Sequence, residues 1–483
     1  MTPLFEPGRN CWKIARAKRA SVIVDACAYY RIIRRAMIEA EQRILIIGWD
    51  FDPRICLEPG ESDESLGAFL LALAKRQRGR TIAILKWNFG ALKTLFRGRA
   101  ILWVLRLART KAIRFKLDGA HPPGCSHHQK IVVIDDVFAI CGGIDMTRHR
   151  WDTPGHADDE PRRLGPDGRP YGPWHDATMA VTGDVATALG ELARDRWQRA
   201  TGEALDAVHG STGFWPEGLD PQFTDVDLAI VRTVAKYDGR PAVKEVEALF
   251  IDMINAAQRF IYAENQYFTS PRIARAIIER LRAANPPEIV LVGPVKADGW
   301  LEQKAMDAAR VRLAQVIGEA DPDNRFRIYS PITAGGDAIY VHAKIMIVDD
   351  EILRVGSANM NNRSLGLDSE CDLAMQASSD GHRSTIAALR TRLMAEHLGA
   401  SAEDVDRSFA ETASLHRTIE ALGGPGRRLR LLELEQPSVE EEFIAETELL
   451  DPKDPDEMFE NFTRKSLFSG LGSFVGRRFR AAG

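Results

Sequence analysis

The chain has few cysteines. Its 483 residues contain six, and no two of them form a CxxC pair: Cys11, Cys27, Cys56, Cys125, Cys141 and Cys371. Secreted disulfide scaffolds and cysteine-ligated zinc modules need cysteines paired at short spacing. Both classes are therefore excluded, and we expect six buried, unpaired thiols. We also expect no metal ion and no other cofactor.

The chain also lacks long apolar runs and an excess of one charge. Its longest apolar stretches, such as Ile44–Gly48 and Ile131–Ile134, are far shorter than the roughly 20 residues that cross a bilayer. The N-terminus has no apolar core of a secretory signal. Lys and Arg total 64 against 68 Asp and Glu, a net charge of -4, which argues against general attraction to nucleic acid. We expect a cytoplasmic protein with no transmembrane segment and no nucleic-acid partner.

One segment is present twice. Residues 126–136 (SHHQKIVVIDD) align without a gap with residues 340–350 (YVHAKIMIVDD). Each copy contains the pattern HxKxxxxD, made by His128, Lys130 and Asp135 and again by His342, Lys344 and Asp349. One match of three fixed residues is weak, but two matches in aligned surroundings indicate an internal duplication.

Two further pairs of segments support the duplication. Residues 40–46 (AEQRILI) match 256–262 (AAQRFIY) upstream of the motifs, and residues 176–181 (DATMAV) match 370–375 (ECDLAM) downstream. The downstream pair aligns Asp176 with Glu370. An additional segment rich in Gly, Pro and Arg, around Trp151–Tyr171, distinguishes the first half.

Helical periodicity alternates with short apolar runs in both halves, which indicates a mixed α/β fold of the α+β type. Helices are predicted over Ala26–Glu41, Leu66–Arg78, Ala242–Ala257 and Pro271–Ala284, and strands over Arg43–Gly48, Thr81–Lys86, Phe260–Ala263 and Glu288–Val292. The predicted domains are a first half (1–208), a connector (209–238, with its Gly/Pro-rich part at His209–Gln222), a second half (239–400) and an extension (401–483). The extension is expected to be helical, then acidic, then basic and aromatic.

The repeated motif places an imidazole beside an ammonium group, because side chains two apart on a strand share a face. Packing the halves about a pseudo-twofold axis would bring two such pairs into one site. One neutral imidazole can then attack phosphorus and form a phosphohistidine. The other, protonated, donates to the leaving oxygen and later activates water or an alcohol. The two lysines supply positive charge to the phosphate oxygens.

The acidic residues near the motifs have two different expected roles. Asp135 and Asp349 lie on the opposite parity from the His and Lys, at a tight turn, so we predict that they fix the loop. Asp176 and Glu370 are the candidates for the carboxylates that keep an imidazole protonated near neutral pH.

These features resemble the phospholipase D superfamily, in particular lipid-acting members with two HxKxxxxD motifs. The resemblance spans about residues 20–400 and also rests on Gly142-Gly143, Gly356-Ser357-Ala358-Asn359, Arg363-Ser364, residues 261–268 (IYAENQYF) and residues 173–176 (PWHD). It implies two pseudo-symmetric halves, each a mostly β sheet flanked by helices, packed as an internal pseudo-dimer with the active site at the interface, in a protein that is otherwise monomeric.

The resemblance further implies roles for individual residues. His128 is expected to be the nucleophile, His342 the general acid and base, and Asn359 a phosphate contact. Asp145 aligns with Asn359 but cannot donate a hydrogen bond when ionised, so no phosphate contact is assigned to it.

The implied function is that of a phospholipase D, which hydrolyses glycerophospholipids to phosphatidic acid and a free alcohol at a membrane surface, as a peripheral protein. The alternative is a transphosphatidylase such as a cardiolipin synthase, because both reactions share the phosphohistidine and differ only in the acceptor. A nuclease is less favoured because the net charge is slightly acidic. A non-catalytic relative is less favoured because both His and both Lys are present.

Near the site, several residues keep two interpretations. Glu264, Asn265 and Gln266 either shape the pocket or satisfy backbone groups at a strand end. His156 and Trp151-Asp152 lie either at a pocket rim or in a surface loop. His127 is predicted to point away from the catalytic face.

Two basic segments also have two interpretations each. Leu92–Lys116 is either a membrane-docking surface or the solvated face of a helix. Phe462–Arg480 is either an interfacial anchor for anionic lipid or a tail docked on its own domain.

Overall fold

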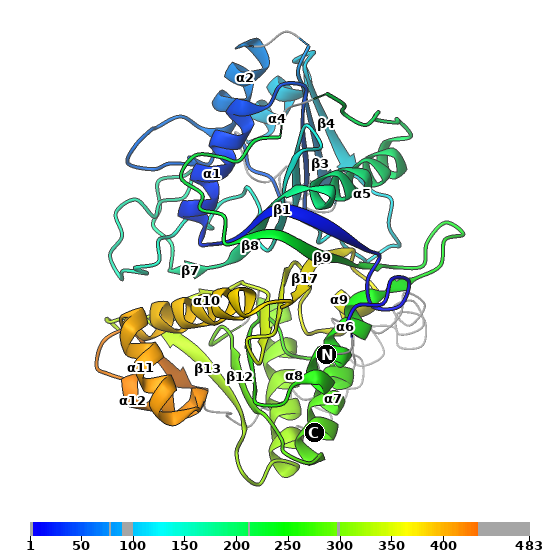
Figure 1. The fold of residues 1–483 in the computed structure, drawn as a ribbon. Coiled ribbons are helices and arrows are strands. Elements are labelled where there is room, and N and C mark those ends of the chain that lie inside the picture. Colours follow the sequence, from blue (N-terminus) through cyan, green and yellow to red (C-terminus); the bar gives the residue numbers. More distant parts are fainter. Residues whose placement is uncertain (1–2, 77–78, 89–99, 211–212, 297–299, 433–483) are drawn as a thin grey trace, which may run out of the picture.

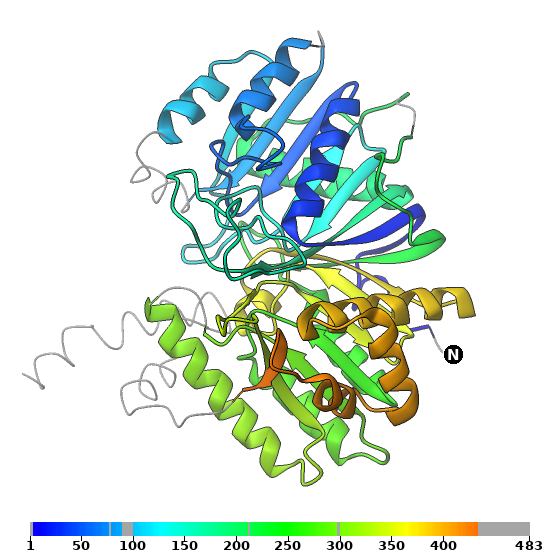
Figure 2. The same ribbon diagram turned by 90° about the vertical axis from the view of Figure 1, so that its left-hand side faces the viewer.

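The computed structural model describes residues 3–76, 79–88, 100–210, 213–296 and 300–432. Two bodies of sheet and helix lie one above the other, with the early part of the chain in the upper body and the later part in the lower one (Figure 1). The view turned by 90° shows the same stacking (Figure 2). The fold is therefore mixed α/β, with helices on the outside of a large sheet.

Three strands of the first half, Arg43–Gly48, Ile131–Ile134 and Phe138–Gly142, are short and fully buried because both faces of the sheet are covered there. Their spatial order is β4-β3-β2-β5-β6-β8-β1, with β2–β3 and β3–β4 parallel and the other pairs antiparallel. The bounds are β1 Lys13–Val24, β2 Arg43–Gly48, β3 Thr81–Trp87, β4 Ile113–Asp118, β5 Ile131–Ile134, β6 Phe138–Gly142 and β8 Ala177–Gly183.

The second half has the same strand order, β13-β12-β11-β15-β16-β17-β9, again with two parallel pairs, β11–β12 and β12–β13, followed by antiparallel ones. The bounds are β9 Phe223–Val234, β11 Phe260–Glu264, β12 Glu288–Val292, β13 Phe326–Ile332, β15 Ile345–Val348, β16 Ile352–Gly356 and β17 Glu370–Gln376. Two shorter strands extend this half: β10 (Val243–Lys244) pairs with β9, and β18 (Arg428–Leu431) pairs with β13.

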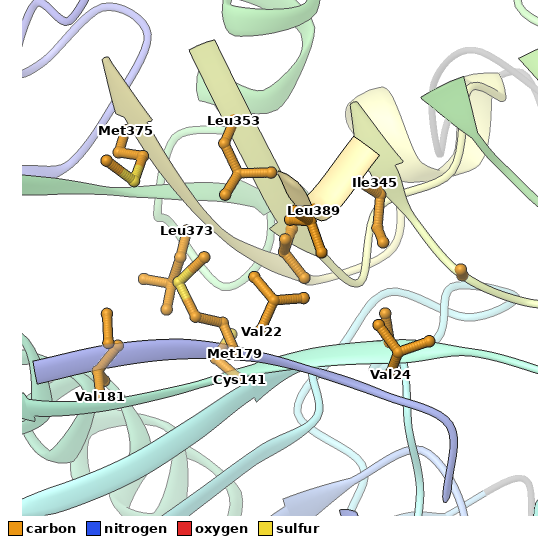
Figure 3. Packing of buried hydrophobic residues seen from close by; sticks show 14 of the residues in the cluster. Val22, Val24, Cys141, Met179, Val181, Ile345, Leu353, Leu373, Met375 and Leu389 are labelled. Carbon is orange, nitrogen blue, oxygen red and sulfur yellow. The ribbon is translucent and has the colours of Figure 1, made fainter. Parts of the chain in front are cut away.

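The two halves meet along a pair of strands and through side chains between their sheets. The central strands β1 and β9 pair antiparallel, with Ala17 opposite Val226, so all described strands except Trp174–His175 and Tyr340–Val341 form one continuous sheet. That sheet folds back on itself, and apolar side chains of β1 and β8 face those of β16 and β17 across the interface (Figure 3). Burying each such side chain contributes about 1.5–3 kcal/mol.

Alternate side chains of each strand pack on opposite sides of the sheet. In β2, Ile44 and Ile46 pack under the outer helices, whereas Leu45 and Ile47 belong to the cluster between the halves. The helices of the first half are α1 (Ala26–Glu39), α2 (Leu66–Arg76), α4 (Ala100–Ala108) and α5 (Asp184–Thr201). Those of the second half are α6 (Glu245–Ala256), α7 (Pro271–Arg282), α8 (Trp300–Glu319), α9 (Asn362–Gly366), α10 (Asp380–Leu398), α11 (Ala402–Thr412) and α12 (Leu415–Leu422).

Two strands, β9 and β18, lie in segments for which the sequence predicted no strand. The segment 209–238, predicted to be a connector, ends in β9, which pairs with both β1 and β17 and so belongs to the sheet. The predicted helical extension contains α11 and α12 but also the edge strand β18. The acidic and the basic aromatic parts of the extension, including Phe462–Arg480, lie outside the described residues.

The cysteines are all unpaired, but only four are buried, because Cys27 and Cys56 are partly exposed. Among the described helices, none combines the length and the apolar character needed to span a bilayer.

Candidate active site

Each HxKxxxxD motif contains a strand, with the His and Lys before it and the Asp after it. His128 and Lys130 precede β5, and His342 and Lys344 precede β15. Both strands end in an Asp-Asp pair with positive φ: 52° and 56° at Asp135 and Asp136, and 58° and 59° at Asp349 and Asp350. Aspartate tolerates this left-handed conformation better than most residues.

Asp135 and Asp349 bond the same backbone positions in the two halves. Asp135 accepts three backbone N–H groups where β2 begins, from Glu41, Gln42 and Arg43, at 2.5–2.9 Å. Asp349 accepts those of Gln258, Arg259 and Phe260 where β11 begins, at 2.6–2.8 Å. These contacts fasten the turn of each motif to the neighbouring strand.

The two histidines are held across the interface between the halves. Nδ1 of His128 lies 3.0 Å from a carboxylate oxygen of Glu370, and Nδ1 of His342 lies 2.7 Å from Asp176 Oδ2. Each imidazole thus contacts the carboxylate contributed by the other half. An Nδ1–H donated to the carboxylate leaves Nε2 with a lone pair for attack or proton transfer.

Backbone hydrogen bonds between the halves also hold each histidine beside its carboxylate. His128 N donates to Ser369 O at 2.9 Å, and His342 N donates to His175 O at 2.8 Å. The second bond continues a short parallel pairing of β7 (Trp174–His175) with β14 (Tyr340–Val341). The residue next to each carboxylate therefore holds the backbone of the histidine that the carboxylate contacts.

The two lysines have different partners. Lys130 Nζ donates to His128 O at 2.8 Å and lies 3.5 Å from Asp145 Oδ2. Lys344 Nζ donates to the carbonyl of His342 and, at 3.1 Å, to Gln266 Oε1. Lys130 therefore contacts a carboxylate directly, whereas Lys344 contacts an amide oxygen.

Asn359, the predicted phosphate contact, is buried, and its Oδ1 accepts no hydrogen bond from the described residues. Its contact with phosphate stays a prediction.

Electrostatic interactions connect the two His–Lys pairs. Burial, followed by the positive charges of Lys130 and Lys344, holds the pKa of His128 well below its usual value. Burial holds the pKa of His342 well below its usual value too, and the charges of Lys344, Arg150, Lys130 and His128 add to this effect. The two pairs thus interact with one another.

Burial favours the neutral form of both imidazoles, whereas the sequence predicts that one of them is protonated. Burial raises the pKa of Glu370 to about 8 and lowers that of Lys344 to about 7. The pKa of Asp176 is also raised by burial. The reason is that desolvation outweighs the attraction of each carboxylate for its imidazole, so burial favours the uncharged state of both pairs.

Some contributors were not predicted. Ser357 and Ser364 donate to the two oxygens of Glu370, at 2.5 and 2.6 Å. The Trp174 ring stacks on Tyr340, with centroids 4.6 Å apart, and lies 5.2 Å from the His342 ring. The guanidinium of Arg150 lies 4.0 Å from the centroid of the Trp174 ring. Ser357, Ser364 and Trp174 belong to segments that carried the resemblance, whereas Arg150 gave no sequence signal.

The residues near the site for which the sequence left more than one interpretation open have different contacts in the structure. Gln266 contacts Lys344, so it takes part in the site, whereas Asn265 Oδ1 accepts the backbone N–H of Met360 at 3.0 Å. Glu264 contacts His175, at 2.7 Å. His127 bonds Ser369 Oγ at 2.9 Å and lines a separate cavity of about 290 Å³ whose lining does not include His128.

The structure also bears on two segments that the sequence could place at the surface: the one with Trp151, Asp152 and His156, and the basic segment Leu92–Lys116. His156, Asp152 and Trp151 are buried, so the surface-loop interpretation is wrong for them. In the basic segment, residues 92–99 lie outside the described part of the chain. Arg114 and Lys116 pair with Glu203 at 3.8 and 3.0 Å, and Leu102 is 62% exposed.

Comparisons with known proteins find similar sequences and a similar fold. A family model described as Phospholipase D matches residues 327–423, which include the second motif. Phospholipase D delta of Arabidopsis thaliana is 25% identical over 79% of this chain and 63% of its own length, and Phospholipase D A of Dictyostelium discoideum is 25% identical over 78% and 35%. The chain therefore spans less than two thirds of the length of these relatives.

A solved structure, phosphatidylserine synthase from Haemophilus influenzae Rd KW20, superposes with a TM-score of 0.57 over 85% of this chain and 97% of its own, at 12% identity. At that identity the match shows a shared fold alone. The fold and the paired motifs define a class of proteins built from two HxKxxxxD halves. Together with the family model and the sequence relatives, the paired motifs make the chain similar to the phospholipase D superfamily.

Proposed function

We propose that the protein is a phospholipase D-type phosphodiesterase that hydrolyses glycerophospholipids to phosphatidic acid and a free alcohol through a phosphohistidine. Similarity to phospholipase D proteins supports an enzyme of the phosphodiesterase or transferase class. The observation that carries the proposal is that each imidazole contacts a carboxylate of the other half: His128 contacts Glu370, and His342 contacts Asp176. Two oriented imidazoles and two ammonium groups in mutual electrostatic contact suit a double displacement at phosphorus.

In the first step, Nε2 of His128 attacks phosphorus and the bond from phosphorus to the headgroup oxygen breaks. The side chain of His128 is 15% exposed against 8% for His342, so it is the more accessible imidazole. His342 gives its proton to the headgroup oxygen, which leaves as an alcohol. The negative charge of the bound phosphodiester favours the protonated form of His342 and so offsets the effect of burial.

In the second step, His342 removes a proton from water as the water oxygen attacks phosphorus. The phosphorus–nitrogen bond breaks, and phosphatidic acid leaves. Lys130, Lys344 and the amide of Asn359 stabilise the equatorial phosphate oxygens in both steps. An alcohol in place of water gives a transphosphatidylase such as a cardiolipin synthase. Because the substrate resides in a bilayer, we place the enzyme at a membrane surface as a peripheral, cytoplasmic protein.

The test is incubation with mixed phospholipid vesicles, with and without glycerol or another primary alcohol, followed by lipid analysis and a parallel plasmid-nicking assay. Phosphatidic acid formed without alcohol supports the hydrolase. Phosphatidylglycerol or cardiolipin as the main product supports the transferase. Nicked plasmid with no change in the lipids would refute both lipid reactions.

Variants connect the activity to the site. His128→Asn and His342→Asn should each lower the rate by at least about 10³-fold, because neither displacement step proceeds without its imidazole. The matched control is His209→Asn, an exposed histidine away from the motifs, which should leave the rate unchanged. Near-full activity in either motif variant would contradict the proposal.

A further inference from the structure

A buried cluster of histidines and carboxylates lies behind Asp176. We name it the His–carboxylate cluster, and it consists of Asp25, His156, His175 and Glu396. Each of these residues is at most 7% exposed. One ligand atom from each lies within 4.8 Å of all the others.

The cluster joins distant parts of the chain. Asp25 lies between β1 and α1, His156 in the loop between β6 and β7, and His175 at the end of β7, next to Asp176. Glu396 comes from the last turn of α10 in the second half. No short ligand spacing in the sequence therefore indicates the cluster.

Four contacts between a carboxylate and an imidazole within the cluster are 2.8–3.8 Å long. Glu396 Oε1 lies 3.2 Å from His156 Nε2 and 2.8 Å from His175 Nδ1. Asp25 Oδ2 lies 3.8 Å from His156 Nε2, and its other oxygen, Oδ1, lies 3.3 Å from His175 Nδ1. Four ligands at the 2.0–2.1 Å typical of Zn²⁺ stand about 3.3 Å apart from one another.

The far nitrogen of each imidazole contacts another carboxylate. His156 Nδ1 lies 2.9 Å from Asp152 Oδ2, and His175 Nε2 lies 2.7 Å from Glu264 Oε2. A metal-bound histidine characteristically donates its other N–H to a carboxylate, which fixes the tautomer and directs the lone pair at the metal. Both imidazoles have this arrangement.

Asp25 supplies an independent observation. Its side chain is fully buried, yet neither carboxylate oxygen accepts a hydrogen bond in the described structure. A buried carboxylate that accepts no hydrogen bond is costly. Both of its short contacts lead to the ring nitrogens of the cluster, so a cation among these groups would satisfy it.

The charge balance also favours a divalent cation. Four carboxylates surround the cluster, counting Asp152 and Glu264 with its own two. Arg163 contacts Asp152 at 3.1 Å, and the charge of Arg427 acts on Asp25, Asp152 and Glu396. With neutral imidazoles, four negative and two positive charges leave two negative charges.

We propose that the His–carboxylate cluster binds one Zn²⁺ ion through four side chains: Asp25, His156, His175 and Glu396. Two imidazoles and two carboxylates in a closed tetrahedral set are ligands suited to zinc. With four protein ligands the ion has no open position for substrate, so its role is structural. It ties α10 to β7 and thereby positions Asp176, the carboxylate that contacts His342.

The alternative is that both imidazoles carry an extra proton and no zinc binds. The same carboxylates favour that state, because they raise the pKa of His156 to about 9 and that of His175 well above its usual value. The experiment separates the two possibilities. The full chain, purified without a histidine tag, is equilibrated with Zn²⁺, desalted and analysed for metal by mass spectrometry. Zinc binding predicts about one equivalent per chain, and protonation predicts less than about 0.1 equivalent.

Variants locate the ion. Asp25→Asn keeps the shape of the side chain and should abolish the bound zinc, and Asp152→Asn should weaken zinc affinity about 10–100-fold, as loss of an outer partner does. His416→Gln, at a buried histidine outside the cluster, should keep the full equivalent.

A second measurement covers variants that do not fold. A chelator should lower the thermal midpoint of the unmodified protein, because an ion bound only to the folded state stabilises it. Less than about 0.1 equivalent in the unmodified protein, equal zinc in Asp25→Asn, or a midpoint insensitive to chelator would each overturn the proposal.

Discussion

At the residue scale, the main feature of the site is that each imidazole is oriented by a carboxylate from the other half. The 2.7 Å contact of His342 with Asp176 sets which ring nitrogen carries the proton. The sequence alignment identified both carboxylates as partners of the imidazoles. It could not show which carboxylate serves which imidazole, because long-range backbone bonds such as His342 N to His175 O decide this.

Replacing Asp176 with Asn tests the orienting role. The Asn amide can donate to Nδ1 and so moves the ring proton to Nε2, the position required for catalysis. We expect kcat to fall about 10²–10⁴-fold with little change in KM, by analogy with other carboxylate–imidazole pairs. The measurement is steady-state kinetics on a soluble short-chain phospholipid. Asp159→Asn, at an exposed site, is the control, and an unchanged kcat in Asp176→Asn would contradict the role.

Glu370 should also make stability depend on pH. Burial raises its pKa to about 8 in the folded chain, against about 4.3 for an unperturbed glutamate. The folded state therefore binds more protons between these values, so the stability that Glu370 contributes is lost as pH rises from about 4 to about 8. Lys344, whose pKa is lowered to about 7, acts in the opposite direction above that pH.

The difference between the unmodified protein and Glu370→Gln isolates this effect. We expect the free energy of unfolding of the unmodified protein to decline relative to that of Glu370→Gln between about pH 5 and 8. Urea unfolding at several pH values measures it. A constant difference across this range would show that the two states bind equal numbers of protons at Glu370.

At the element scale, the Asp-Asp turns attach each motif strand to its neighbour. Asp349 satisfies three backbone N–H groups and has a positive φ. We expect Asp349→Ala to destabilise the fold by about 2–4 kcal/mol, because the N–H groups lose their acceptor and alanine disfavours this φ. Asp349→Asn, which keeps an oxygen acceptor and tolerates the conformation, should cost less.

Chemical unfolding measures both variants. Asp380→Ala removes an aspartate side chain that is 99% exposed and should change stability by less than about 0.5 kcal/mol. An equally small effect of Asp349→Ala would show that the turn does not depend on these bonds.

The elements that the sequence predicted were those with a local pattern. Arg43–Gly48 is an unbroken buried run, and β2 occupies that range. In contrast, the first seven residues of β1 include four basic ones (Lys13, Arg16, Lys18 and Arg19), and only its last five residues are all buried. Its strand conformation depends on β8 and β9, which are distant in sequence, so a local pattern could not reveal it. The same holds for β9 within the predicted connector and for β18 at the sheet edge.

At the scale of the whole molecule, the interface between the halves carries both the core and the site. Leu373 of β17 is fully buried in the cluster between the sheets, opposite the strands of the first half (Figure 3). Leu70 of α2 is equally buried, but within the first half alone. The two leucines form a matched pair for separating stability from alignment of the halves.

Leu373→Ala and Leu70→Ala should each cost about 2–5 kcal/mol of stability. Under conditions where both variants are fully folded, only Leu373→Ala should also lower kcat. This is because it loosens the packing between the halves, which aligns the imidazoles of His128 and His342. Kinetics together with chemical unfolding test this prediction. Equal kcat in the two variants would mean that the interface core does not control the geometry of the site.

The most direct test of the central claim is to trap the covalent intermediate. The enzyme is mixed with a short-chain phospholipid, quenched rapidly under conditions that preserve phosphohistidine, digested, and mapped by mass spectrometry. The account predicts a phosphatidyl group on the peptide that carries His128, and no adduct in His128→Asn. An adduct on His342 alone, or turnover with no histidine adduct at any quench time, would contradict it.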